Sequence, residues 1–311
     1  MFEKVLIPTD FSKHAEKLID CIGEVPGLKE AVLLNVVSRD PLARVWSPGD
    51  EVKEAEKKLV VEKSRLEKIG LKVKARVEPA LEGAVGEVIK RVGDEEGVSL
   101  VAMGARGRSI FKGVLLGSVS TDELRYGDKN LLIMRYKSLD AREGEDLETF
   151  CTRLFTKVLC PIDFSEAGMA ALNVIKAGKI GDEVVLLHVV TRAEKEEELQ
   201  AEIQSAEKKL NAIKDDLASA GIKATVQVQK AHPGEDRTYG TGGMAAVRPP
   251  MIAGGAADKI ISAAENEDVS IIAMSSHGTG WVEKLLIGSV VFDVARRGTR
   301  PVLVIRSKMN A

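Results

Sequence analysis

The 311-residue chain contains the same sequence pattern twice. The segment VLIPTDFS at 5–12 returns as VLCPIDFS at 158–165, and LLGSV at 115–119 returns as LIGSV at 286–290. Early in each copy, the matching positions keep the same spacing without a gap. A repeat of this length predicts two domains of one fold rather than a single large domain.

Composition places the boundaries between the two copies. We expect the first domain at 1–138, a solvated linker at 139–154 that contains the charged stretch DAREGED, and the second domain at 155–311. The second copy has about twenty extra residues at 232–255, whose Gly and Pro content predicts an irregular loop. This loop follows a predicted strand, so it is either a flap beside a ligand site or an excursion without a role.

Apolar runs alternate with segments of helical periodicity in each copy. The runs of the first copy are Lys4–Pro8, Ala31–Val37, Val73–Val77, Ser99–Met103 and Leu131–Arg135. These runs are apolar on both faces, which is typical of strands inside a parallel sheet. We therefore predict two repeated, doubly wound α/β domains, each with a five-stranded parallel sheet and right-handed crossovers.

Charge and composition exclude several classes of protein. The net charge is −2 and the pI is about 6.2, so no basic excess is present to bind nucleic acid or an anionic membrane. No apolar run approaches the roughly 20 residues of a membrane span, and we expect a cytoplasmic protein. Cys21, Cys151 and Cys160 lack the spacing of a disulfide framework or a metal site, so no protein metal site is predicted.

Ligands of open parallel sheets bind beyond the carboxyl ends of the strands. In each copy an aspartate stands there, in PTD at 8–10 and in PID at 161–163. The aspartate can bind a sugar hydroxyl or an adenine amino group. Alternatively, it belongs to a helix N-terminal cap together with Ser12 or Ser165, and the two roles can coexist.

A glycine-rich segment follows the fourth predicted strand of the first copy. It reads MGARG at 103–107 and, after nine residues, GSVS at 117–120. Glycines let the backbone approach a ligand closely, and the N-terminus of the following helix favours a phosphate. We expect the hydroxyls of Ser118 and Ser120 to add donors.

This combination resembles the nucleotide-binding signature of the universal stress protein family. The similarity rests on Gly104-x2-Gly107-x9-Gly117-Ser118 behind a strand that ends in PTDFS, and it covers both copies. The chain is therefore similar to a tandem universal stress protein, with the adenine nucleotide alpha hydrolase-like fold. Because family members of the binding type hold ATP or AMP, the resemblance implies such a ligand here, with Mg²⁺ as an addition bound through the phosphates.

The resemblance also implies which residues of the first copy surround the nucleotide. They are Pro8, Thr9, Asp10, Val36, Val37, Met103, Gly104, Arg106, Gly107, Arg108, Gly117, Ser118, Val119 and Ser120.

The second copy departs from the pattern at several positions, and at one of them Thr279 replaces Arg108. Ser275 replaces Gly104, and His277 replaces Arg106, which lowers the positive charge near the phosphates. We still expect binding, with a different phosphate preference as an open alternative, and we interpret His277 as a rim residue rather than a base. The implied site residues are Pro161, Ile162, Asp163, Val189, Val190, Met274, Ser275, His277, Gly278, Gly288, Ser289 and Val290.

Three functions compete at this point. The first is a regulatory stress-response protein that binds ATP or AMP at two sites with little or no turnover. The second is a slow ATP hydrolase, although GxxxxGK[ST] is absent and no catalytic residue is predicted. The third is a scaffold with a vestigial second site. In the family that the chain resembles, the last strand pairs with that of another domain. The last apolar strands of the copies, 131–134 and 302–305, would otherwise expose an edge, so they are expected to pair in an internal pseudo-dimer, and a homodimer of chains stays open.

Overall fold

The structure is a computed structural model. It describes residues 1–39, 49–81, 83–106, 116–138, 147–149, 153–191, 196–231, 254–278 and 287–306. Two predicted residues of the first site, Gly107 and Arg108, lie outside these ranges, as does 232–253 of the candidate flap.

The first domain alternates strands and helices. Its elements are β1 (Lys4–Pro8), α1 (Lys13–Cys21), η1 (Ile22–Glu24), β2 (Glu30–Arg39), α2 (Gly49–Lys68), β3 (Lys72–Leu81), α3 (Val85–Glu96), β4 (Leu100–Gly104), α4 (Ser118–Tyr126) and β5 (Asn130–Met134). The strands β2 and β3 are longer than the predicted apolar runs. Their last residues are only partly buried or exposed, so these residues fall outside the apolar runs.

The second domain repeats this order. Its elements are β8 (Lys157–Pro161), η2 (Ala167–Met169), α5 (Ala170–Gly178), β9 (Glu183–Val190), α6 (Glu196–Ser219), β10 (Lys223–Lys230), α7 (Gly254–Asn266), β11 (Ile271–Ser275), α8 (Ser289–Arg297) and β12 (Val302–Ile305). Between the domains, β6 (Tyr136–Ser138) and β7 (Leu147–Thr149) form a small antiparallel sheet within and just before the predicted linker.

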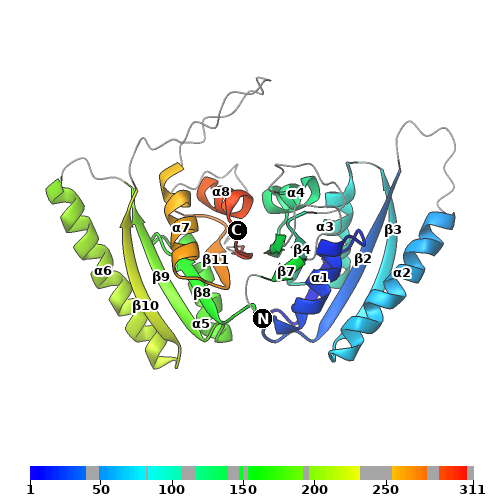
Figure 1. Ribbon diagram of the computed structural model, residues 1–311, viewed down its shortest axis with the longest axis horizontal. Helices are drawn as coiled ribbons and strands as arrows, with labels where there is room; N and C mark the ends of the chain where they lie inside the picture. The colour runs from blue at the N-terminus through cyan, green and yellow to red at the C-terminus, as the bar shows by residue number, and fades with distance from the viewer. Residues whose placement is uncertain are drawn as a thin grey trace, which may run out of the picture.

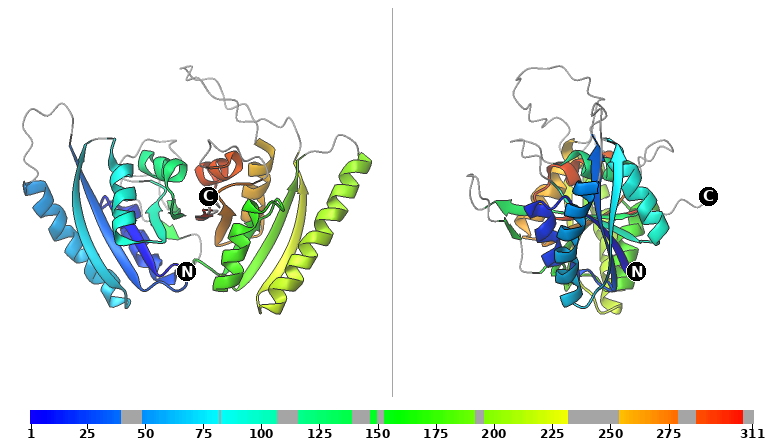
Figure 2. Two further views of the ribbon diagram at one scale, coloured as in Figure 1. Left: turned by 180° about the vertical axis from the view of Figure 1, so that it is seen from behind. Right: turned by 90° about the vertical axis from the view of Figure 1, so that its right-hand side faces the viewer.

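The two domains share one ten-stranded sheet with the strand order β10-β9-β8-β11-β12-β5-β4-β1-β2-β3. Each domain contributes five parallel strands, as predicted, and the halves join where β12 pairs antiparallel with β5. In Figure 1, α8 and α4 lie near this junction, whereas α6 and α2 lie at the outer ends. Figure 2 shows the same halves from behind. The pairing of the last strands that the edge argument predicts is therefore present.

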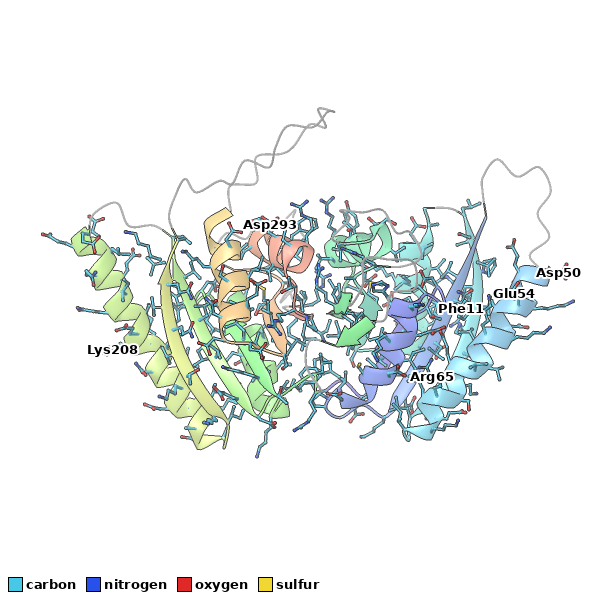
Figure 3. All side chains as sticks on the ribbon, in the orientation of Figure 1. Phe11, Asp50, Glu54, Arg65, Lys208 and Asp293 are labelled. Carbon is cyan, nitrogen blue, oxygen red and sulfur yellow. The ribbon has the colours of Figure 1, made fainter. Side chains whose placement is uncertain are left out.

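Each face of the sheet is covered by helices from both domains. Leu18 of α1 and Leu59 of α2 belong to one apolar cluster with Leu210 of α6. Ile89 of α3 and Val294 of α8 belong to the other cluster. Charged side chains cover the outward faces of α2 and α6 (Figure 3), as expected for helices that bury one face against a sheet.

Two arginines clamp the junction in a reciprocal way. Arg306, just after β12, donates from Nη2 to the carbonyls of Glu123 and Leu124 near the end of α4, at 2.9 Å each. Arg135, just after β5, donates to the carbonyls of Ala295 and Arg296 in α8. Each guanidinium thus supplies donors to carbonyls at the end of the other domain's helix, where cations are favoured.

Among the described residues, no helix is long and apolar enough to cross a membrane. In the same part of the chain, the side chains of Cys21 and Cys160 are buried, and no cluster of three or more His, Cys, Asp or Glu side chains could hold a metal ion. Cys151 lies outside the described ranges.

Candidate functional site

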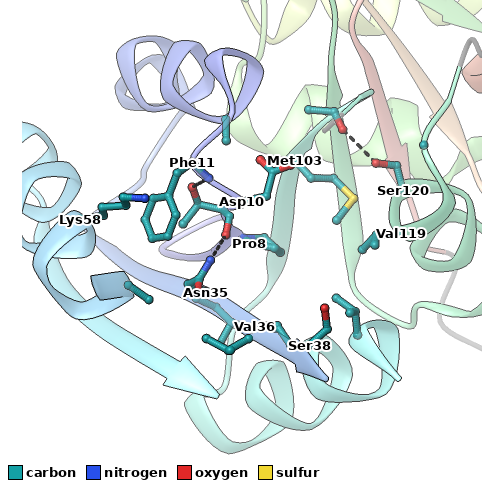
Figure 4. A pocket seen from close by; sticks show the side chains of 18 of the residues that line it. Pro8, Asp10, Phe11, Asn35, Val36, Ser38, Lys58, Met103, Val119 and Ser120 are labelled. Carbon is teal, nitrogen blue, oxygen red and sulfur yellow. Dashed lines mark hydrogen bonds between the residues drawn. The ribbon is translucent and has the colours of Figure 1, made fainter. Parts of the chain in front are cut away.

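A cavity of about 850 Å³ opens at the carboxyl ends of β1, β2 and β4 in the first domain (Figure 4). It extends from α2 to the N-terminus of α4. This is the edge of the sheet where ligands of doubly wound folds bind. Its volume lies in the range of small-molecule sites.

The turn after β1 forms one wall of the cavity. The Thr9 amide donates to the Leu34 carbonyl at 2.8 Å, and the Asn35 side chain donates to the Thr9 carbonyl at 2.8 Å. The Asp10 carboxylate accepts the Ser12 amide at 3.0 Å, and Ser12 in turn caps α1. Asp10 therefore supports the start of the helix while it also lines the cavity, so both of its predicted roles are compatible.

Phe11 follows in the left-handed region, with φ of 60°. A bulky side chain rarely adopts this conformation, and such strain is common at functional sites. The Phe11 amide donates to the Thr9 hydroxyl at 3.1 Å. Across the cavity, the Lys58 ammonium of α2 lies 5.5 Å from the Phe11 ring centroid and pairs with Glu54 at 2.7 Å.

Gly104 ends β4 at a point of close approach. A Cβ atom there would lie 3.0 Å from the Arg106 carbonyl oxygen and 3.3 Å from the His14 Cβ, so only glycine fits without a shift of α1. The Ser120 hydroxyl donates to the Gly104 carbonyl at 2.9 Å. This hydrogen bond joins β4 to α4, and Ser120 also lines the cavity.

Gly117 is the N-cap residue of α4. Its own amide donates to the Ala105 carbonyl at 2.8 Å, which fixes the helix end against the strand end. The next amides, beginning with Ser118 and Val119, belong to the first helical turn, whose N–H groups have no intrahelical acceptor. These two residues line the cavity, so the positive end of the helix dipole faces it.

All twelve described members of the first predicted site line this cavity, and Gly107 and Arg108 are the two outside the described ranges. The sequence interpretation missed ten further lining residues. They are Phe11, Ala15, Leu34, Asn35, Ser38, Glu51, Glu54, Ala55, Lys58 and Val85. Most lie beside a predicted position or on the first turns of α2. The residues of α2 could have been predicted only from the position of this helix over the carboxyl ends of the strands.

Beneath the cavity wall, the Thr9 hydroxyl donates at 3.0 Å to Oε1 of Glu62, a buried residue of α2. Burial raises the pKa of Glu62 to about 7, and the nearby carboxylates of Glu16 and Asp10 act in the same direction, whereas the Thr9 hydrogen bond opposes them.

In the second domain, Asp163 is enclosed more tightly than Asp10. Its Oδ1 accepts both the amide and the hydroxyl of Ser165, at 3.1 and 2.7 Å. A Cβ atom on Gly168 would lie 1.9 Å from Oδ1, and one on Gly278 would lie 2.1 Å from Oδ2. The two glycines are therefore needed to make room for this carboxylate, and the structure brings Asp163 and Gly278 of the predicted site together.

Ser275 changes the first helix of this domain. Its hydroxyl donates to the Gly168 carbonyl at 2.8 Å and accepts the Ala171 amide at 2.9 Å. In an uninterrupted α-helix these groups would bond to helix partners, so the inserted hydroxyl explains why η2 precedes α5. The Ser275 side chain is thus buried and acts in the packing of the helix rather than as an exposed donor.

The remaining predicted residues of the second site keep the positions of their counterparts. Gly288 caps α8, and its amide donates to the Ser276 carbonyl at 2.8 Å, as Gly117 does to Ala105. His277 lies beside the Ser276 hydroxyl, at 2.9 Å. The other members lie at these strand and helix ends: Pro161, Ile162, Val189, Val190, Met274, Ser289 and Val290.

His188 has a structural role in this domain. Its Nδ1 lies 2.7 Å from the Ile162 carbonyl, and its ring lies 4.7 Å from that of Phe164. Asn35 makes the matching bond to Thr9, so both polar side chains brace the turn after the first strand. Lys209 lies 5.0 Å from the Phe164 ring, which repeats the Phe11–Lys58 pair.

The fold and site define a chain of two fused α/β domains, each with a glycine-capped helix facing the ligand edge of its sheet. The model of the universal stress protein family matches residues 1–135 and 154–306. The chain therefore belongs to the universal stress protein family.

Individual relatives agree with this assignment. The chain is 31% identical over 165 residues to universal stress protein MJ0577 of Methanocaldococcus jannaschii, which covers 50% of this chain and 97% of that protein. It also resembles a solved universal stress protein from Archaeoglobus fulgidus, with 24% identity, 99% and 97% coverage and a TM-score of 0.68. A universal stress protein structure from Pseudomonas aeruginosa matches with 14% identity, 98% and 93% coverage and a TM-score of 0.59. The two structures support the fold alone.

Proposed function

We propose that this protein is a regulatory adenine-nucleotide-binding protein that takes part in a stress response. It binds ATP or AMP in each domain with little or no turnover, and occupancy alters its shape or its contacts with a partner. The observation that carries the proposal is the cavity of the first domain, where a glycine-capped helix N-terminus and Asp10 face one space of about 850 Å³.

The parts of the cavity suit the parts of a nucleotide. The first turn of α4 offers backbone donors for phosphate oxygens, which bind an anion without a basic surface. Asp10 offers carboxylate acceptors for a ribose hydroxyl or an amino group. Val36, Val37 and Met103 supply apolar surface for a base. Any Mg²⁺ is bound through the phosphates of the nucleotide, as is usual for this ion.

Turnover is disfavoured by the lining of this cavity. Among the described lining residues there is no histidine and no cysteine, and Asp10 already accepts the Ser12 amide. Phosphoryl transfer also needs a cationic group that contacts the γ-phosphate and neutralises its charge. Arg106 is the described basic residue on the strand side of the cavity, so slow ATP hydrolysis stays the second candidate.

Mass spectrometry of the small molecules released from the purified protein tests the proposal, together with calorimetric titration of AMP and ATP. Gly117→Val places a side chain at the helix N-terminus that lines the cavity, so we expect it to abolish binding in the first domain. Gly288→Val is the matched variant in the second domain. Absence of released nucleotide together with absence of binding would refute the proposal, and rapid phosphate release would favour the hydrolase.

A further inference from the structure

Glu62 is a buried acid within the apolar interface between α2 and the sheet. It is 4% exposed, and its neighbours along the inward face of α2, Leu59 and Leu66, belong to the core. Its Oε1 accepts the Thr9 hydroxyl. Its Oε2 is buried and has no hydrogen-bond partner among the described residues. A buried carboxylate with one unpartnered oxygen is costly, so this environment favours the protonated form.

The charged groups around Glu62 do not neutralise it. From the turn after β1 and from α1, Asp10 and Glu16 raise its pKa. On α2 itself, Arg65 lowers the pKa, but this arginine is paired with Asp20 of α1. Desolvation remains the largest cause.

Other described residues near Glu62 on α2 and on the adjacent strands are a paired lysine and apolar side chains. Lys58, one turn earlier on α2, pairs with Glu54. The strands β2 and β3 contribute Leu33 and Val73 to the same apolar cluster. Titration of Glu62 therefore changes the charge beneath the cavity wall by one unit.

The second domain lacks this acid. Aligned on the buried leucines of α2 and α6, Ile213 stands where Glu62 does, and Ile162 stands where Thr9 does. Nevertheless, Phe164 adopts a φ of 62°, close to the 60° of Phe11. The turn thus forms without the Thr9–Glu62 hydrogen bond, and the difference between the domains at this place is a titratable charge.

We propose that Glu62 determines the affinity of the first site for anionic nucleotide, which binds more tightly when the Glu62 carboxyl is protonated. Thr9 lines the cavity and bonds directly to Glu62, so the carboxyl lies one side chain behind the wall. An ionised Glu62 adds to the negative charge of Asp10 and repels a phosphate-bearing ligand. The second site, with Ile162 and Ile213, lacks this dependence. This inference rests on the proposed function.

The test is calorimetric titration of AMP between pH 5.5 and 8.5 in the full chain. The Gly288→Val background isolates the first site, and Gly117→Val isolates the second. The AMP phosphate itself titrates near pH 6, which changes AMP affinity at both sites. The readout is therefore the difference in the pH dependence of AMP affinity between proteins with Glu62 and with Glu62→Gln, measured at each site. Glutamine keeps an acceptor for Thr9 and cannot ionise. Adenosine, which carries no phosphate, is the control ligand.

We expect the AMP affinity of the first site to fall between pH 6 and pH 8. The fall should be about fivefold larger in the protein with Glu62 than in the Glu62→Gln variant. Adenosine should show no such difference, and neither should the second site. If both forms of the first site have the same pH profile for AMP, the inference is refuted while the proposed function stands. If no nucleotide binds at any pH, the proposed function itself fails.

A measurement on the unmodified protein guards against misfolding of Glu62→Gln. Carboxyl ¹³C NMR follows the titration of Glu62, identified by its selective loss in Glu62→Gln or in Glu62→Ile. By linkage, saturation with AMP must raise the pKa of Glu62 if protonation favours binding. An unchanged or lowered pKa on saturation would overturn the inference.

Discussion

At the end of the fourth strand of each domain, the first domain has Gly104 and the second has Ser275. In the first domain the missing side chain lets α1 approach β4 closely, and α1 begins as a regular α-helix capped by Ser12. In the second domain the Ser275 hydroxyl enters the helix and produces η2 before α5. The two domains therefore differ here by one hydroxyl group. The first has a glycine at the end of its fourth strand, and the second has a serine that bonds to the neighbouring helix.

The two halves of the sheet also differ in the polar groups on their outer strands, β3 and β10. In the first domain, Arg76 of β3 bonds to Glu78, Glu95 and Glu96, and the pKa of Glu96 falls to about 2 as Lys74 and other cations bond to it. In the second domain, Gln227 stands at the place of Arg76 and bonds to Glu267. At this place the first copy therefore has an arginine bonded to three glutamates, and the second has an amide in place of the arginine.

Gly104→Val should have the largest effect on this comparison. A branched side chain at a Cβ position 3.0 Å from the Arg106 carbonyl oxygen and 3.3 Å from the His14 Cβ must displace backbone. We expect a loss of about 2–3 kcal/mol in stability and loss of AMP binding in the first domain. Calorimetric unfolding and titration measure both effects, and unchanged binding would show that the close approach is not part of the site.

Ser275→Gly is the matched change in the second domain. It removes both bonds of the hydroxyl to the first helix, to the Gly168 carbonyl and the Ala171 amide. The cost should be smaller than for Gly104→Val, because the freed groups can bond within a regular helical turn. Equal losses from the two variants would contradict the assigned difference.

Removal of the junction arginines should come next. Arg306→Met and Arg135→Met each abolish donors to two or more carbonyls of the opposite domain, at a cost of about 2 kcal/mol each. We expect hydrogen exchange to rise in β5 and β12 together. Lys208→Met, on the exposed face of α6 (Figure 3), is the control. An effect confined to one domain would show that the clamp is not reciprocal.

The smallest effect is the pH dependence of stability. The pKa of Glu62 is about 7 in the folded chain, above the unfolded value of 4.5, so the folded form holds the proton longer. Its contribution is fully present below pH 4.5 and is lost as pH rises to 7. Glu62→Gln should therefore stabilise the first domain by about 1–2 kcal/mol at pH 8 relative to its effect at pH 4.5. Calorimetric melts at the two pH values measure this, and a constant difference would refute it.

Much of the architecture was accessible from the sequence because apolar periodicity and the internal repeat follow directly from what the core requires. The strands, their parallel order and the pairing of 131–134 with 302–305 depend on apolar patterns and on an edge that must be covered. Glycines placed after a strand and before a helix indicated a phosphate site, whereas the individual residues of the first site were implied by the resemblance to the universal stress protein family. These features are local in sequence and need no knowledge of packing.

Other features depend on contacts between distant segments. The Ser120 hydroxyl bonds to the Gly104 carbonyl, and the Ser275 hydroxyl bonds to the first helix of its domain. Both contacts depend on the distance between elements rather than on residue type. Glu62 is one of many charged residues on α2, and its burial depends on the rotation of that helix against the sheet. Lys58 reaches the cavity for the same reason. A charge run in the sequence does not reveal which of its members faces inward.

Titration of AMP into the full chain by isothermal calorimetry is the most direct test of the account. It predicts two binding events per chain, the first lost in Gly117→Val and the second lost in Gly288→Val. Two events that both survive Gly117→Val would place the ligand outside the first cavity. Absence of heat with AMP and with ATP, in protein shown to be folded and free of bound nucleotide, would contradict the account.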